Sequence, residues 1–178
     1  MTDRCIKKLA QRFRQAIDAA HRDHEFVDDF RFKNFPSGCC GDTSYLLAEY
    51  LLQNGIETIW VSLQRDDWSH SWLVLKDRRV RKPTKISLPD DYIDLISTYR
   101  NQDLEAGTET IHYKEHDLYD GLIIDITSDQ FDDYDIPVYV GYMDVFHQSF
   151  DFIQAIDFGG IYDERLEDLY RIIEAYIR

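Results

Sequence analysis

The sequence predicts a single α+β domain in which helices pack against a mostly antiparallel sheet. Two patterns lead to this prediction. Apolar residues recur at helical spacing near both ends of the chain and after Cys40, whereas several segments between these helices alternate and are rich in β-branched residues. The chain has 178 residues, of which 44% are apolar and 14% aromatic, so it can bury a core without disulfide or metal support.

Residues 3–24 are expected to form the first helix, on an apolar stripe made of Ile6, Leu9, Phe13, Ile17 and Ala20. After a mixed loop the chain reaches a tight turn, where Gly38 and Gly41 allow backbone geometry that a side chain would obstruct. The next residues combine helix-capping types with apolar residues at helical spacing. Cys40 is therefore expected at the first turn of a helix that ends near Gly55.

Two strands are expected next, at 56–63 and 68–75, and the short link between them favours an antiparallel hairpin. His70 lies in the second strand and shares a face with Trp72. A histidine on a buried face needs a partner for each ring nitrogen. His70 is therefore either a core histidine whose hydrogen bonds are satisfied or part of a site.

Residues 77–120 interrupt the alternation with a basic island, two prolines and a candidate helix at 90–105. This segment either shapes a substrate cleft or is a surface excursion. Strands are expected again at 121–127 and 136–142, and a final helix at 161–177. The chain is expected to form one domain, 1–178, throughout.

Two features of these elements suggest chemistry. Cys40, at a helix start, is favoured as a thiolate by the unpaired N–H groups and the helix dipole. Cys39 is expected to pack beneath the turn, although both cysteines could instead be structural. Asp125 lies in the apolar run Gly-Leu-Ile-Ile-Asp-Ile, where a carboxylate is costly unless it is paired or caps a turn.

Three short motifs occur in order along the chain: Gly-x-Cys ending at Cys40, His-x-Trp beginning at His70, and Asp-x-Thr beginning at Asp125. Together they resemble the transglutaminase-like branch of the papain-like cysteine enzymes, over about residues 35–140. The resemblance implies a papain-like/transglutaminase-like fold, with a nucleophile-bearing helix on the sheet and flanking helices. It implies that Cys40 is the nucleophile, His70 the base and Asp125 the group that orients the base.

The same resemblance makes 77–120 an insertion in the family core. It suggests two donors for an oxyanion, the backbone N–H of Cys40 and the side-chain amide of Asn34, because papain-like enzymes carry an amide a few positions before the nucleophile. The implied activity is acyl transfer on a peptide or protein amide, by a protease, amidase or deamidase rather than a transglutaminase. The alternative is a catalytically inactive binding or immunity-type module on the same fold, whose acidic surface would occupy a basic partner.

Composition limits the partners and the location. The chain has 34 acidic and 20 basic residues and a formal charge of −14, which disfavours nucleic acid and anionic membranes as partners. Three cysteines and the lack of a signal-peptide pattern favour the cytoplasm, or export without a cleaved signal. No cofactor motif is present, and the spacing of His112 and His116 lacks the helical context of a metal site, so neither a cofactor nor a metal is predicted.

Overall fold

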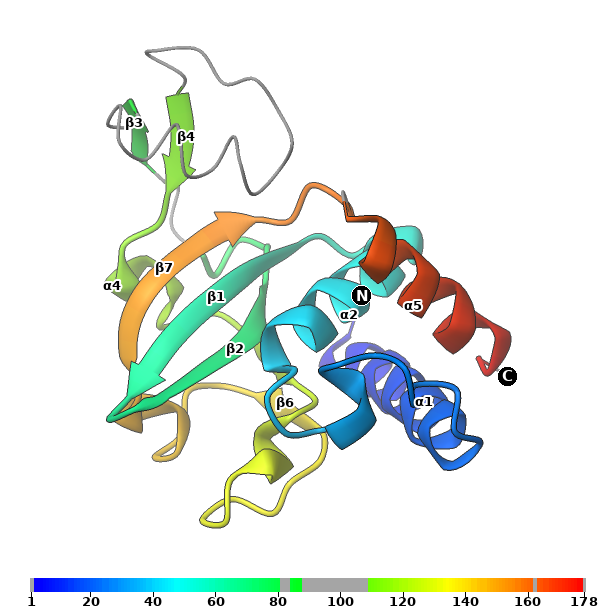
Figure 1. Cartoon of the computed structure of the whole chain (residues 1–178). Coiled ribbons are helices and arrows are strands. Elements are labelled where there is room, and N and C mark those ends of the chain that lie inside the picture. Colours follow the sequence, from blue (N-terminus) through cyan, green and yellow to red (C-terminus); the bar gives the residue numbers. More distant parts are fainter. Residues whose placement is uncertain (1, 81–83, 88–108, 162, 178) are drawn as a thin grey trace.

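The computed structural model describes residues 2–80, 84–87, 109–161 and 163–177. It is an α+β fold with a five-stranded antiparallel sheet in the order β6-β5-β2-β1-β7, and β3 pairs separately with β4 (Figure 1). The predicted class and the antiparallel sheet are confirmed. The helices are α1 (Asp3–Arg22), α2 (Cys40–Gln53), α4 (Glu115–Leu118) and α5 (Glu164–Ala175), with short 3-10 helices η1 (Phe32–Asn34), η2 (Ser128–Gln130) and η3 (His147–Ser149). The strands are β1 (Thr58–Arg65), β2 (Trp68–Leu75), β3 (Thr84–Ser87), β4 (Glu109–His112), β5 (Ile123–Asp125), β6 (Tyr139–Gly141) and β7 (Asp151–Asp157).

One face of the sheet is covered by the three longer helices. α2 packs on β1 and β2, whereas α1 packs on β6 and contacts α2 and α5 (Figure 1). The apolar stripe of α1 is buried at Ile6, Phe13 and Ile17, in the same core as Leu46 and Leu51 of α2. The helices form because each one buries such a stripe, and this packing fixes where α2 begins.

The hairpin of β1 and β2 forms the centre of the sheet. Its register runs from Thr58 opposite Leu75 to Arg65 opposite Trp68, and Asp66 takes a left-handed conformation (φ 53°) in the turn. β2 has the predicted bounds, but β1 begins later than predicted because the N–H of Ile56 still bonds to the last turn of α2. With these bounds, β1 and β2 are paired along their whole length.

β7 is a strand that the sequence did not predict. It pairs antiparallel with β1, with an irregularity in the register beside Ser62. Only Ala155 of β7 is fully buried, so no clean alternation marks this strand in the sequence. β5 and β6 are shorter than predicted at both ends: each begins later than expected, and the chain leaves the sheet directly after Asp125 and Gly141.

The second face of the sheet carries a separate aromatic core. Trp72 of β2 lies at its centre, and the segments after β5 and β6 supply Phe131, Phe146 and Phe150. α4 belongs to the predicted insertion 77–120, and the candidate helix 90–105 lies outside the described residues.

Candidate functional site

Cys40 is the first residue of α2. Its side chain is 8% exposed, and its Sγ lies 3.9 Å from the carbonyl oxygen of Ser69 at the start of β2. The first helical bond runs from the N–H of Thr43 to the carbonyl of Cys39, so the N–H of Cys40 precedes the hydrogen-bonded part of the helix. Gly38 has φ 72° and makes the turn before it, as the sequence indicated.

Cys39 occupies a different environment from Cys40. Its side chain is buried, with Sγ 3.3 Å from the carbonyl of Pro36 and 3.6 Å from Oγ1 of Thr43. Burial raises the pKa of the Cys39 thiol to about 12. Cys39 is therefore a poor nucleophile near neutral pH, and it packs beneath the turn.

His70 and Asp125 form a buried pair between β2 and β5. His70 Nε2 lies 2.7 Å from Asp125 Oδ2, and both side chains are fully buried. β5 pairs with β2 only at Leu73 and Val74, so Asp125, its last residue, stands beside β2 where the two strands separate. The other carboxylate oxygen accepts from the N–H of Thr127 at 2.9 Å. Asp125 thus pairs with the histidine and also caps its own turn.

Aromatic side chains enclose the imidazole of His70. The rings of Trp72, Phe131 and Phe150 lie 5.5, 5.0 and 5.5 Å from it, centroid to centroid. This burial would lower the pKa of His70, but the charge and hydrogen bond of Asp125, together with Cys40, raise it to about 9. The imidazolium form is therefore stabilised inside an apolar enclosure.

Gln130, in η2, contacts the second nitrogen of His70. Its Nε2 lies 3.1 Å from His70 Nδ1, and its Oε1 accepts from the backbone N–H of Gly38 at 3.2 Å. Gln130 thus joins the segment after Asp125 to the turn before Cys40. Sequence reasoning missed this residue, because five positions past a strand end is not a spacing that suggests a site.

His147, in η3, is a second histidine on Asp125. Its Nε2 lies 3.5 Å from Asp125 Oδ2, and its Nδ1 lies 2.6 Å from Asp144 Oδ1. Burial would raise the pKa of Asp125, but His70 and His147 outweigh it and hold this pKa well below its usual range. In sequence His147 sits in an aromatic, acidic stretch without recognisable periodicity, so only the three-dimensional structure reveals it.

Arg14 of α1 anchors to the first helix the segment that follows Asp125 and carries Gln130. The guanidinium is 7% exposed, and it donates to both carboxylate oxygens of Asp129, to the carbonyl of Ile126 at 2.7 Å and to that of Pro137 at 3.0 Å. A buried arginine with these partners fixes the position of η2 relative to α1. It lies on the predicted first helix, where sequence alone gave no reason to single it out.

The remaining predicted site residue, Asn34, ends η1 on the surface. Its side chain is exposed, and no hydrogen bond within the described part of the chain joins it to Cys40 or His70. The same described residues contain no group of three or more His, Cys, Asp or Glu side chains placed to hold a metal ion. Nor do they contain a helix with the length and apolar character needed to cross a membrane.

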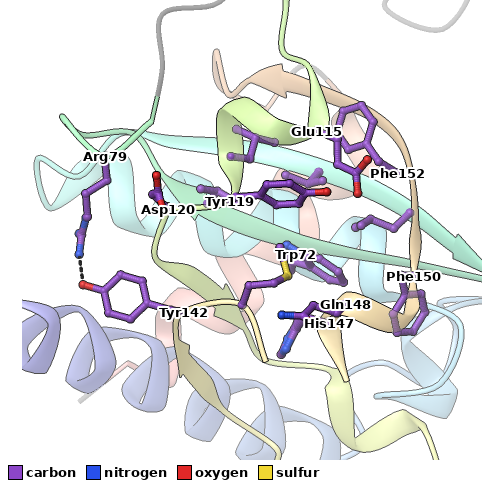
Figure 2. A pocket seen from close by; sticks show the side chains of 15 residues that line it. Trp72, Arg79, Glu115, Tyr119, Asp120, Tyr142, His147, Gln148, Phe150 and Phe152 are labelled. Carbon is purple, nitrogen blue, oxygen red and sulfur yellow. Dashed lines mark hydrogen bonds between the residues drawn. The ribbon is translucent and has the colours of Figure 1, made fainter. Parts of the chain in front are cut away.

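A cavity of about 800 Å³ lies on the aromatic face of the sheet, and it meets the site at His147 (Figure 2). His147 and Trp72 form part of its wall, and Arg79 donates to the hydroxyl of Tyr142 at 2.7 Å across one side. Cys40 and Gln130 are not among its lining residues, so the cavity is separate from the Cys40 end. It is lined by Val61, Leu63, Trp72, Val74, Arg79, Glu115, Leu118, Tyr119, Asp120, Tyr142, Met143, His147, Gln148, Phe150 and Phe152.

The structure therefore brings His70, Asp125, His147 and Gln130 into one network and places Cys40 at the start of α2 beside it. Comparison of the chain with protein-family models, with curated proteins and with solved structures found no match.

Proposed function

We propose that the protein is a cysteine-dependent acyl-transfer enzyme with a papain-like, transglutaminase-like arrangement, acting on an amide or peptide carbonyl. The observation that supports this most is the pair between His70 Nε2 and Asp125, 2.7 Å apart and fully buried. Because Asp125 takes Nε2, proton exchange with Cys40 would use Nδ1, from which Gln130 would have to withdraw. Cys40 in turn is the first residue of α2, at the helix end where backbone N–H groups are unpaired.

The reaction then follows from these roles. His70 Nδ1 accepts the proton of Cys40, and the thiolate attacks the carbonyl carbon to give a tetrahedral oxyanion near the N–H of Cys40. The oxyanion collapses, the C–N bond breaks, and the leaving amine takes the proton from His70. Asp125 stabilises the imidazolium throughout.

The thioester that remains on Cys40 is resolved by water or by an amine. Water gives a protease, amidase or deamidase, and an amine gives a transglutaminase. We propose hydrolysis, on a peptide or protein amide, as the sequence resemblance implies. Hydrolysis and transfer to an amine would use the same three residues. A product assay is therefore needed to identify whether water or an amine is the acceptor.

Selective alkylation tests the proposal. Cys5 is exposed and would react first, so the experiment uses a Cys5→Ser background with limiting iodoacetamide near neutral pH and peptide mapping. We expect the label on Cys40 before Cys39, and a slower reaction in His70→Ala. Equal labelling of Cys39 and Cys40, or a rate that ignores His70, would contradict the proposed nucleophile and base.

An inactive binding or immunity-type module is the second candidate. Two observations favour it: Gln130 occupies Nδ1 of His70, and the Cys40 side chain is only 8% exposed. Incubation with p-nitrophenyl acetate, followed by intact mass measurement, separates the two candidates. An acetyl group retained on Cys40, or repeated release of p-nitrophenol, supports the enzyme if it is absent in Cys40→Ser. An unmodified chain that releases no p-nitrophenol although Cys40 is reactive supports the module.

A further inference from the structure

The two contacts of Gln130 fix the direction of a hydrogen-bond chain through the site. The backbone N–H of Gly38 can only donate, so the atom of Gln130 that faces it at 3.2 Å is the carboxamide oxygen. The NH₂ end of the same carboxamide therefore faces His70 Nδ1, at 3.1 Å. Since an NH₂ group only donates, Nδ1 must be the acceptor and carry no proton.

The proton of the neutral imidazole then lies on Nε2, which faces Asp125 at 2.7 Å. The chain runs from Gly38 through Gln130 and His70 to Asp125, and every donor in it meets an acceptor. In this tautomer the single lone pair of Nδ1 accepts from Gln130, so Gln130 must move aside before Nδ1 can take a proton from Cys40.

Protonation of His70 breaks this pattern. With a proton on Nδ1, the imidazolium and the NH₂ of Gln130 would point two donors at each other. Turning the carboxamide over does not help, because its NH₂ would then face the N–H of Gly38. Gln130 must therefore give up either His70 or Gly38 whenever His70 becomes charged.

We propose that Gln130 is a positioning residue of the thiol site, which holds His70 in its neutral, Nε2-protonated form and so opposes the pull of Asp125 toward the imidazolium. This inference rests on the proposed function, since it describes how the base is tuned. A general base works best when its pKa lies near the operating pH. Asp125 raises the pKa of His70, whereas the side-chain N–H of Gln130 lowers it by donating to the neutral imidazole.

The inference also couples two parts of the site. Gly38 lies two positions before Cys40, and its N–H is held by the same carboxamide that contacts His70. Charging of His70 is thereby linked to release of Gln130 from one of its two anchors. The other charged or titratable groups around His70 are Asp125 from β5 and Cys40 from α2 and, one side chain further out, His147 from η3 and Arg65 from β1.

Two variants of Gln130 test the proposal. Gln130→Met keeps the length of the side chain and removes the donor, so the pKa of His70 should rise, and alkylation of Cys40 below its pH plateau should be faster by on the order of fivefold. Gln130→Glu supplies a carboxylate that accepts from both Gly38 and the imidazolium, so the pKa of His70 should rise further. Gln11→Met, on the exposed side of α1, is the matched control and should change neither quantity.

The measurements are the ¹⁵N chemical shifts of His70 against pH, and the pH profile of iodoacetamide labelling of Cys40 in the Cys5→Ser background. In the unsubstituted protein the neutral imidazole should carry its proton on Nε2, a result that needs no variant. The opposite tautomer, or an unchanged His70 pKa in both variants, would overturn the role of Gln130. If His70→Ala labels Cys40 as fast as the parent, the proposed function fails instead, so the two failures are distinguishable.

Discussion

Asp125→Asn tests the buried His70–Asp125 pair most directly. In the parent protein the pKa of His70 is raised from 6.5 to about 9, which corresponds to a preference of roughly 3 kcal/mol for the imidazolium. Asparagine keeps the shape of the side chain and removes its charge. Burial by the aromatic rings then acts against the imidazolium with only Cys40 opposing it, so the pKa of His70 should fall well below 9.

The consequence for stability has a definite sign. Because the folded-state pKa of His70 is raised, its contribution to the free energy of unfolding is fully present below pH 6.5 and is lost as the pH rises through about 9. Urea unfolding of the Cys40→Ser protein should show a decrease of up to about 3 kcal/mol over this range, from this group. Asp125→Asn in the same background should lack that decrease. If the decrease persists, His70 does not owe its pKa to Asp125.

Three further predictions follow from the contacts around this pair. His147→Gln should lower the free energy of unfolding by about 1–3 kcal/mol in urea, because Asp144 loses its contact with the buried ring nitrogen Nδ1 of His147. His116→Gln, at an exposed site, should not lower it. Arg14→Met should cost about 3–5 kcal/mol by leaving the carboxylate of Asp129 unpaired, and a loss under about 1 kcal/mol would contradict this role for the arginine. Asn34→Ala should change the rate at which p-nitrophenyl acetate acylates Cys40 by no more than about twofold. A rate lower by about 10²-fold or more would instead support Asn34 as an oxyanion donor.

The fold class was predictable because its evidence is local. The apolar stripe of α1 and the alternation in β2 each specify one element, and the short turn between β1 and β2 specifies their pairing. β7 was not predictable in this way, because it is stabilised by pairing with β1 along an edge rather than by its own alternating pattern. Periodicity in a sequence reports burial of one face of a strand, and neither face of β7 is extensively buried.

The residues of the candidate site differ in the same way: some carry a local signal in the sequence and others do not. Asp125 was conspicuous because a carboxylate in an apolar strand must find a partner, and the partner in the structure is His70. Gln130 and His147 lie in segments without strand or helix periodicity, and their roles depend on where 3-10 helices return to the sheet. A glutamine is chemically ordinary in sequence, and only its contacts with Gly38 and His70 distinguish it.

The burial of this network bears on what it is for. The side chains of His70, Asp125 and His147 have no exposed surface, and ionic groups in such a place cost more than apolar residues of similar volume would. In a protein that only presents a surface to a partner, such groups could serve the fold alone, because the partner cannot touch them. The network approaches the outside at Cys40, which is 8% exposed, and at the half-buried Gln130. Under the proposed function, the chemistry of the network would therefore act on a substrate that reaches the start of α2.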